Sequence, residues 1–328
     1  MKKKIIIFSG EPKSINPELI FKSWKKISNN LKKQIYVISN YRLLINQFRS
    51  LKYKIKVKKV ENITECENDI FLKVIDVDLN FKNLSSLKQN DIAYFINRGL
   101  SLAHELGLKK DVKGIINCPI NKNHLNKKFY GATEFFASKC SIKKNSEVML
   151  ISSKKFSVSP ITTHVDLKYV SKKLNSGLII NKIKTINLCF RNIFKKKPKI
   201  AVLGLNPHNS EFKSNSEENK IILPAIKKLK KLKIKLDGPF AADTLFVNKY
   251  KNYDVVVGMF HDQVITPFKT LYKFNAINIT LGLKYLRVSP DHGTAVDIVG
   301  KNKSKVNSLL DCINFINKYG KWIFQKDR

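Results

Sequence analysis

Short apolar runs alternate with longer segments of helical periodicity along most of the chain. The runs are rich in Ile and Val and mostly unbroken, which is typical of strands buried on both faces of a parallel sheet. Strands are predicted at residues 4–9, 34–39, 69–75, 113–118, 147–152, 199–205, 254–259 and 276–280. Apolar residues recur at helical spacing in 91–106, 222–232 and 305–316. This alternation predicts an α/β fold with a mainly parallel sheet.

One stretch departs from the alternation of strands and helices. Residues 147–152 and 156–162 both have the character of strands, and only Ser153, Lys154 and Lys155 separate them. That spacing predicts a β-hairpin, so we expect one antiparallel pair in the sheet.

The length of the chain predicts more than one lobe. Its 328 residues exceed the roughly 250–300 at which a single core stops growing, and 43% of them are hydrophobic. The longest apolar run, near 255–260, is much shorter than the roughly 18 residues that span a bilayer, so we expect no membrane partner. Residues 1–10 superficially resemble a secretory signal, but Glu11 and Pro12 end the apolar run too early. We interpret this segment as a buried strand.

The charge of the chain is strongly positive but poor in arginine. Lys and Arg together number 62 against 25 Asp and Glu, a net charge of +37, yet only six of the 62 are Arg. Arginine is the residue that recognises phosphates and base edges with two hydrogen bonds, so we expect no nucleic-acid partner. The lysines accompany abundant Asn and Ile, which indicates compositional drift. The lysines of 227–231 are interpreted as a solvated helix face.

The cysteines indicate a reducing compartment. Five are scattered along the chain without a CxxC pair, and an odd number does not suit a disulfide framework. They are Cys66, Cys118, Cys140, Cys189 and Cys312. A cytoplasmic location fits this pattern best.

Three histidines follow predicted strands directly. His164, His208 and His261 come after the runs 159–163, 200–206 and 255–260. Ligands of open α/β sheets gather at the carboxyl ends of strands, so these side chains are expected to converge. Three imidazoles that leave one position open suit a divalent metal acting as a Lewis acid. A capping or packing role remains the alternative for each histidine alone, and structural or surface roles suffice for His104 and His124.

Charged residues accompany the histidines. Asp262 adjoins His261, and Asp243 follows a Gly-Pro turn. Either carboxylate is suited to orient an imidazole or to move a proton, although Asp243 is equally suited to cap a helix. Lys269 and Arg287 are candidate anion binders near the same predicted strands. An ordinary surface ion pair is the alternative for Arg287.

The segment 291–300 is a loop of small and polar residues between a predicted strand and a predicted helix. Small side chains let backbone groups approach a flat ligand closely. The chain contains neither a G-x-G-x-x-G fingerprint nor a P-loop, so no nucleotide motif of these kinds supports the assignment.

Several motifs, in order, resemble those of the 4-hydroxythreonine-4-phosphate dehydrogenase family over nearly the whole chain. They are Gly-Glu-Pro at 10–12 with Asn-Pro-Glu at 16–18, Pro-Ile-Asn-Lys at 119–122, Gly-Ala-Thr-Glu-Phe-Phe at 131–136, Thr-Thr-His at 162–164, Gly-Leu-Asn-Pro-His at 204–208, Ala-Asp-Thr-Leu-Phe at 242–246, His-Asp-Gln at 261–263, Asn-Ile-Thr-Leu-Gly-Leu at 278–283 and Asp-His-Gly-Thr-Ala at 291–295. The resemblance implies a fold similar to isocitrate and isopropylmalate dehydrogenases, with two α/β/α lobes around a central cleft. We expect a first lobe at 1–125 plus 285–328, which carries the cofactor-side loop. The second lobe, 126–284, is expected to carry the metal and substrate residues and to dimerise.

The resemblance also implies roles for individual residues. His164, His208 and His261 match the metal ligands, the last supplied across the interface of a homodimer. Thr133, Lys269, Asn278 and Arg287 match substrate contacts. His292, Gly293, Thr294, Ala295 and Asp297 are similar to an adenine-side cofactor loop of the related β-decarboxylating dehydrogenases. The cofactors implied are NAD or NADP and one divalent metal, Zn, Mg or Co, in each subunit.

The implied reaction is the oxidation and decarboxylation of 4-phosphooxy-L-threonine in pyridoxal phosphate synthesis. Asp243, Asp262 and Lys122 are the candidates for moving the proton, and the sequence does not rank them. Two departures concern the substrate: Ala132 stands where the family usually has His, and the first loop, 10–18, lacks most of the usual glycines. A related phosphorylated sugar acid, 4-phospho-erythronate or threonate, is therefore the alternative substrate. A metal hydrolase and a polyanion binder are more distant alternatives.

Overall fold

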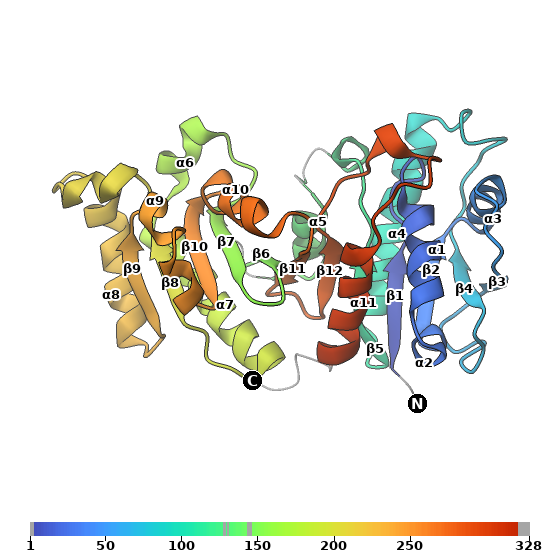
Figure 1. Ribbon diagram of the computed structural model, residues 1–328, viewed down its shortest axis with the longest axis horizontal. Helices are drawn as coiled ribbons and strands as arrows, with labels where there is room; N and C mark the ends of the chain where they lie inside the picture. The colour runs from blue at the N-terminus through green and yellow to red at the C-terminus, as the bar shows by residue number, and fades with distance from the viewer. Residues whose placement is uncertain (1–2, 127–128, 130, 143–145, 321–328) are drawn as a thin grey trace. The chain divides into compact units, whose positions relative to one another are not determined.

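The computed structural model describes residues 3–126, 129, 131–142 and 146–320, and the chain divides into two compact units (Figure 1). The first unit comprises Met1–Cys140 and Lys284–Arg328, and the second comprises Ser141–Leu283. The chain therefore passes from the first unit to the second at 140–141, whereas the sequence analysis expected this boundary at 125–126. Helix α5 (Ala132–Lys139) packs on α4 (Gln89–Gly107), which keeps Thr133 in the first unit.

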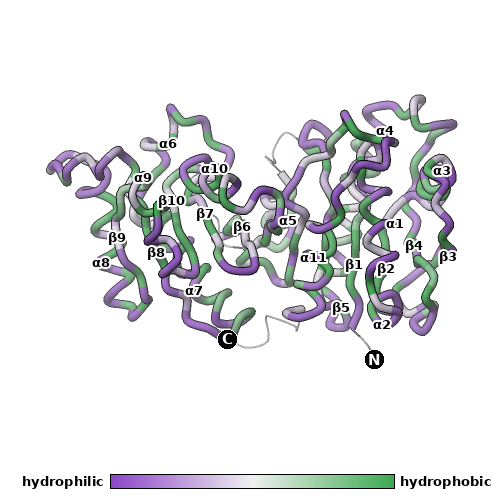
Figure 2. Tube along the Cα trace, in the orientation of Figure 1, coloured by the Kyte–Doolittle hydropathy of each residue, from purple (hydrophilic) through white to green (hydrophobic). Residues whose placement is uncertain are grey.

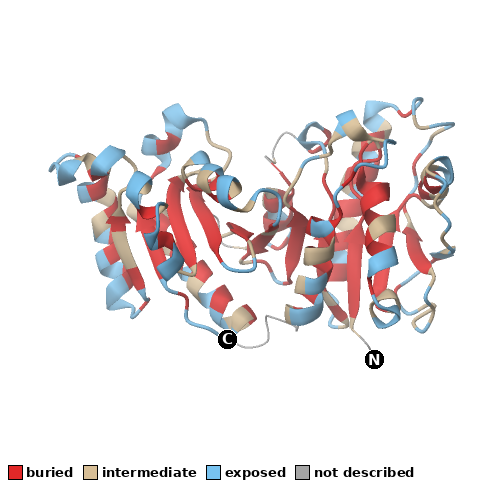
Figure 3. Ribbon diagram, in the orientation of Figure 1, coloured by how far each residue is buried: buried red, intermediate tan, exposed pale blue. Residues whose placement is uncertain are grey.

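The first unit contains a parallel sheet in the order β3-β4-β2-β1-β5-β12, and each of these strands pairs with its neighbour in parallel. The strands are β1 (Lys4–Phe8), β2 (Ile35–Ser39), β3 (Val57–Val60), β4 (Leu72–Asp76), β5 (Val112–Asn117) and β12 (Arg287–Pro290). The central strands β1 and β2 are buried throughout, as the unbroken apolar runs predict (Figures 2 and 3).

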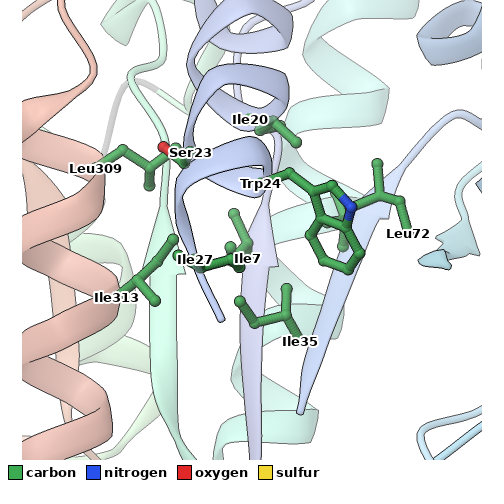
Figure 4. Close-up of a pocket in the computed structure, with 10 residues that line it drawn as sticks. Ile7, Ile20, Ser23, Trp24, Ile27, Ile35, Leu72, Leu309 and Ile313 are labelled. Atoms are coloured by element: carbon green, nitrogen blue, oxygen red, sulfur yellow. The ribbon is translucent and has the colours of Figure 1, made fainter. Parts of the chain in front are cut away.

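Helices cover both faces of this sheet because alternate side chains of a strand point to opposite faces. Ile7 lies with Ile20 and Trp24 of α1 and with Ile313 of α11 around a small apolar pocket (Figure 4). The next residue, Phe8, packs against α4, where a Cβ on Gly99 would lie 2.2 Å from its ring. The helices are α1 (Asn16–Lys26), α2 (Asn29–Lys32), α3 (Tyr41–Ser50), α4, η1 (Lys122–His124), α5, η5 (Val296–Ile298) and α11 (Asn307–Tyr319).

The second unit contains a mixed sheet in the order β11-β6-β7-β10-β8-β9. Its strands are β6 (Val148–Ser152), β7 (Ser157–Thr162), β8 (Ile200–Leu203), β9 (Leu236–Phe240), β10 (Val255–Phe260) and β11 (Ile277–Leu281). Strand β6 is antiparallel to both β7 and β11, and the other pairs are parallel. The predicted hairpin is thus confirmed as β6 and β7.

Two groups of helices cover the second sheet. One group, α9 and α10, contributes Leu245, Val264 and Phe268 to a core that includes Val256 and Leu203 of the strands. The other group contains α7 and α8, which pack on each other and on β6, β7, β9 and β11. The helical segments are α6 (Leu167–Lys173), α7 (Ser176–Phe194), η2 (Pro207–Phe212), η3 (Glu218–Ile222), α8 (Leu223–Lys231), α9 (Ala242–Leu245), η4 (Lys249–Asn252) and α10 (His261–Tyr272).

The predicted α/β fold is confirmed, and each predicted strand and helix has a counterpart. Three strands were not predicted, because β3 is partly exposed and carries Lys58 and Lys59, β9 contains Gly238 and Pro239, and β12 has only four residues. The lysines of α8 are exposed, and the five cysteines are free. Within the described ranges, no helix has both the length and the apolar character needed to cross a bilayer.

Candidate active site

The three candidate histidines follow three adjacent strands of the second unit. Strand β10 lies between β7 and β8 and is parallel to both, so their carboxyl ends lie at one edge of the sheet (Figure 1). His261 follows β10 directly and begins α10, His164 comes two residues after β7, and His208 lies in η2 after β8. The sequence analysis placed them at strand ends, and the structure shows that these strands are neighbours.

Two of the histidines approach each other within one chain. The ring centroids of His164 and His261 are 5.8 Å apart. His208 instead faces Asp243, with 4.0 Å between Nδ1 and Oδ2. Among the residues that the structure describes, no three His, Cys, Asp or Glu side chains form a group that could hold a metal ion. The expectation that a second subunit completes the set stays a prediction.

Each of two histidines has a carboxylate near its Nδ1 atom. His261 Nδ1 lies 2.7 Å from Asp262 Oδ1, a hydrogen bond in which the ring nitrogen donates. Asp243 is in the first turn of α9, where its Oδ1 accepts from the Thr244 backbone N–H, but the N-cap is Ala241. A carboxylate at Nδ1 fixes the tautomer and leaves Nε2 to coordinate. The imidazole nitrogens are thus donors of the kind that a divalent metal takes, although the three do not meet within the described part of one chain. Asp243 is not the helix cap that the sequence left open.

The backbone is strained at two of the three histidines. His164 has φ of 50° and His208 has φ of 49°, which places both in the left-handed region. Residues other than glycine adopt this region rarely, and strained backbone is concentrated at functional sites.

Gln263 joins two of the strand ends, and the sequence analysis gave it no role beyond its place in the His-Asp-Gln motif. Its Nε2 donates to the Gly204 carbonyl at 2.7 Å, and its Oε1 accepts from the Met259 backbone N–H at 2.7 Å. Thr162 Oγ1 donates to the Met259 carbonyl at 2.8 Å. The ends of β7, β10 and β8 are thus held together by side chains far apart in sequence.

The first unit contains a buried arginine. Arg287, at the start of β12, is 2% exposed, and its Nε donates to Asn117 Oδ1 at 2.6 Å. One of its terminal nitrogens donates to Thr133 Oγ1 at 3.3 Å, and the guanidinium lies 5.7 Å from the centre of the Phe136 ring. Burial lowers the pKa of Arg287 to about 10. Two predicted substrate contacts, Arg287 and Thr133, are therefore brought together.

Lys122 is exposed and opens η1, beside the loop that follows β1. Glu11 of that loop accepts hydrogen bonds from the Asn121 backbone N–H at 3.2 Å and from His124 Nδ1 at 2.9 Å. His124 Nε2 contacts Gln89 Oε1, so His124 is buried and bonded rather than on the surface. His104 has the expected structural role, with Nδ1 2.9 Å from the hydroxyl oxygen of Tyr285.

The other predicted substrate contacts lie in the second unit. Lys269 is on α10, two turns after His261, and its Nζ lies 4.9 Å from the centre of the Phe274 ring. Asn278 is on β11, and its buried Oδ1 has no hydrogen-bond partner within the described part of the chain.

The predicted cofactor loop joins β12 to α11. A Cβ on Gly293 would meet nothing within 4 Å, and Ala295 has φ of 48°. The carbonyl of Thr294 accepts from the Ile15 backbone N–H at 3.3 Å, which ties this loop to the loop after β1. His292 is partly buried and Asp297 is exposed. An open glycine beside an anchored backbone fits a flat ligand.

Comparison with known proteins shows what the chain is similar to. The family model described as pyridoxal phosphate biosynthetic protein PdxA matches residues 30–316. The 4-hydroxythreonine-4-phosphate dehydrogenase of Aquifex aeolicus (strain VF5) is 37% identical over 96% of this chain and 98% of its own, and that of Sulfurihydrogenibium sp. (strain YO3AOP1) is 36% identical over 94% and 96%. The crystal structure of 4-hydroxythreonine-4-phosphate dehydrogenase from Klebsiella pneumoniae superposes with a TM-score of 0.83 at 28% identity, covering 97% of this chain and 100% of that one. The chain belongs to the family of the pyridoxal phosphate biosynthetic protein PdxA.

Proposed function

We propose that this chain catalyses the NAD-dependent, metal-assisted oxidation and decarboxylation of 4-phosphooxy-L-threonine to 3-amino-2-oxopropyl phosphate, in pyridoxal 5′-phosphate synthesis. The observation that carries the proposal is similarity over nearly the full length to relatives that bear the name of this dehydrogenase. The placement of three histidines at one sheet edge supports it from the chemistry of the chain itself.

His164, His208 and His261 are the residues that would hold a divalent metal, Zn, Mg or Co. When bound, such a metal lowers the pKa of a coordinated hydroxyl and stabilises negative charge that develops on its oxygen. Asp262 keeps the proton of His261 on Nδ1, and Asp243 is placed to do the same for His208. With the proton on Nδ1, the Nε2 lone pairs would be available to hold the metal.

Arg287, Thr133, Lys269 and Asn278 are proposed to bind the substrate. The guanidinium of Arg287 is held by Asn117 and Thr133, so little side-chain entropy remains to be lost when an anion binds. Lys269 is a second cation for the phosphate or carboxylate. The partnerless Oδ1 of Asn278 is an acceptor for a donor such as the substrate's amino group.

Oxidation of the alcohol releases a proton, for which Asp243, Asp262 and Lys122 were the candidates. The two aspartates already face imidazoles. Asp262 accepts a hydrogen bond from His261 and Asp243 lies 4.0 Å from His208, so both are suited to orient imidazoles, which favours Lys122 for proton transfer. Glu11 holds the residues on both sides of Lys122 through Asn121 and His124.

The remaining partners are proposed on the same basis. NAD or NADP would supply the hydride acceptor, with the loop residues His292, Gly293, Thr294, Ala295 and Asp297 on its adenine side. We further propose a homodimer in which each subunit completes the other's metal site. A cytoplasmic location is proposed because five free cysteines suit a reducing compartment.

The test is a comparison of substrates with one enzyme preparation. The purified protein, supplied with Zn²⁺, Mg²⁺ or Co²⁺ in turn, is given NAD and either 4-phosphooxy-L-threonine or 4-phospho-D-erythronate, and both NADH and carbon dioxide are measured. We expect both products with the amino acid. Turnover of the sugar acid alone would transfer the assignment to the alternative substrate, which the small Ala132 keeps open. Release of phosphate without NADH would indicate a hydrolase instead.

A further inference from the structure

The turn that carries His208 has an unusual backbone. Five consecutive residues have left-handed φ values: His208 at 49°, Asn209 at 58°, Ser210 at 47°, Glu211 at 51° and Phe212 at 55°. None is glycine, and left-handed helical conformation is unfavourable for such residues because it places Cβ too close to the following carbonyl oxygen. A turn of this kind persists only where surrounding contacts determine it.

A buried carboxylate holds the segment that enters the turn. Glu218 is fully buried, and its Oε1 accepts from the backbone N–H groups of Leu205 and Asn206 at 2.8 Å each. Its Oε2 accepts from Asn206 Nδ2 at 3.1 Å. Burial raises the pKa of Glu218, but the hydrogen bonds from Asn206 and Leu205 outweigh it and leave the pKa below its ordinary value. The segment that leads from β8 to His208 is therefore anchored to an ionised group.

The middle and the far end of the turn are also held. Asn209 is buried, its backbone N–H donates to the Asn206 carbonyl at 3.1 Å, and its Nδ2 donates to the Pro239 carbonyl at 3.2 Å. Asn219, next to Glu218, donates from Nδ2 to the Phe212 carbonyl at 3.1 Å. Both ends of the turn thus bond to two consecutive residues of η3.

The segment η3 is itself irregular. Glu218–Ile222 forms a single π-helical turn before α8. Such turns are rare in proteins, and those that occur are often found at functional sites. Because the helix begins with this turn, Glu218 lies within hydrogen-bond distance of Leu205 and Asn206, just after β8, and Asn219 lies beside Phe212. The hydrogen bonds from Glu218 and Asn219 therefore support the strained turn at both ends, and the turn presents the side chain of His208, which is 75% exposed.

We propose that Glu218 is a positioning residue for His208: by holding residues 205 and 206, it maintains the left-handed turn that aims the imidazole at the metal. The inference rests on the proposed function, since it takes His208 to be a metal ligand. Glu218 does not touch the metal or the substrate in this scheme. Its effect passes through the backbone of the turn.

The test measures metal binding and backbone protection separately. Co²⁺ is titrated into the full-length protein and followed by its visible absorption, and hydrogen exchange is measured for 204–213. We expect Glu218→Ala to weaken Co²⁺ binding by about 10–100-fold, the range for partners that orient a ligand, and to speed exchange at Leu205 and Asn206. Glu218→Gln should recover part of both, because its amide oxygen can accept from the same two N–H groups.

Glu217→Gln is the matched control, because the hydrogen bond that the structure shows for the Glu217 carboxylate, among the residues it describes, is from the Asn206 side chain, at 2.9 Å. It loses the same charge at the adjacent position and should leave Co²⁺ binding within about twofold of the wild type. If Glu218→Ala does not fold, Glu218→Gln and Glu218→Asp are compared, and the shorter Asp should bind Co²⁺ more weakly than Gln.

Two negative results are distinguishable. Faster exchange in Glu218→Ala with unchanged Co²⁺ affinity would overturn the positioning role while leaving the metal site in place. Unchanged Co²⁺ binding in His208→Ala would instead refute the metal assignment on which the inference rests, whatever the exchange data show.

Discussion

The two units present their candidate functional groups in opposite ways. In the first unit, the guanidinium of Arg287 is 2% exposed and bonded to Asn117 and Thr133. In the second unit, the side chain of His208 is 75% exposed and that of His261 is 37% exposed, and the structure shows each facing a single carboxylate. The first unit therefore buries a charge that is already oriented, and the second exposes imidazoles, which can be uncharged, at the carboxyl ends of its strands.

This difference follows from what each group is proposed to bind. A buried cation attracts a phosphate or carboxylate more strongly, because little water screens the interaction. Imidazoles coordinate through an uncharged nitrogen, and the metal itself supplies the charge, so these ligands do not need a buried environment beforehand. The comparison predicts that substitution of Arg287 alters substrate affinity, whereas substitution of the three histidines or of their carboxylate partners alters metal binding and turnover.

The largest effect is expected for His261→Ala. Loss of a metal ligand removes the stabilisation of developing negative charge, which is worth several kcal/mol, so kcat/KM should fall by about 10³-fold or more. Co²⁺ binding should weaken in parallel. Both are measured on protein whose thermal unfolding midpoint is unchanged, as expected for a partly exposed side chain.

The matched control is Lys273→Ala. Lys273 directly follows the end of the same helix, and its side chain is exposed. It should leave metal binding and turnover unchanged. If His261→Ala retained full turnover, the proposed role of His261 as a metal ligand would be wrong.

Strand positions were predictable because they depend on local apolar runs. His164, His208 and His261 could be placed at strand ends, but the order β7-β10-β8, which makes them neighbours, depends on contacts between residues about 55 to about 100 positions apart. Gln263 and Glu218 escaped prediction for a related reason. Gln263 bonds to Gly204 and Glu218 to Leu205, and no periodicity or spacing marks such pairs.

The pair of Glu11 and His124 shows the same limit in the first unit. The two residues are separated by more than a hundred positions, and His124 lies among polar residues that indicate a surface loop. Burial of a polar residue becomes visible only when its partner is placed. Family resemblance supplied expectations that local patterns could not, namely the proposed roles of Thr133 and Asn278 in substrate binding.

The second prediction concerns Arg287→Lys. Lysine keeps the charge but loses the planar fork, so it cannot bond to Asn117, Thr133 and an anion in the same geometry. Hydrogen bonds to charged groups contribute about 1.5–3 kcal/mol, so KM for the phosphorylated substrate should rise by about 10–100-fold. Co²⁺ affinity should stay unchanged, because no candidate metal ligand is altered.

Steady-state kinetics and a Co²⁺ titration on one preparation check this separation. A fall in Co²⁺ affinity with an unchanged KM would contradict the proposal that Arg287 binds the substrate and not the metal.

The third prediction compares two conservative changes at the histidine edge. Asp262→Asn keeps the shape but exchanges the carboxylate that faces His261 Nδ1, at 2.7 Å, for an amide. Asp243→Asn does the same for His208 at 4.0 Å. Removing a carboxylate partner of a ligand typically costs 10–100-fold in metal affinity or activity, and we expect about tenfold for Asp262→Asn and less for Asp243→Asn.

Co²⁺ titration of both variants gives the ranking. Equal losses would show that the second subunit or the metal brings His208 and Asp243 closer than they are in one chain.

The smallest effect is expected for Lys73, a second buried cation of the first unit, on the pH dependence of stability. Lys73 is fully buried on β4, its Nζ donates to the Lys33 carbonyl at 2.7 Å, and it lies 4.5 Å from the centre of the Tyr36 ring. Burial lowers the pKa of Lys73 to about 8 from an ordinary value of 10.5. The folded protein therefore releases this proton at a lower pH than the unfolded chain does.

Between the folded and unfolded pKa values the unfolded chain binds more protons, so the Lys73 contribution makes stability rise with pH. Below pH 8 the cost of burying the charge is fully present. We expect the free energy of unfolding to gain about 1–2 kcal/mol from Lys73 between about pH 7.5 and about pH 9.5, a window that ends before ordinary tyrosines ionise. Chemical denaturation at several pH values measures it.

The signal is isolated by subtracting the profile of Lys73→Met, which lacks the titrating group. Lys58→Met is the matched control, because Lys58 is the exposed partner of Lys73 in the register of β3 and β4 and its pKa is raised rather than lowered. Its profile should therefore run parallel to that of the wild type throughout this window. If Lys73→Met also ran parallel, the Lys73 ammonium would be as well solvated by backbone carbonyls as by water, and the first unit would hold its buried charges without a cost in stability.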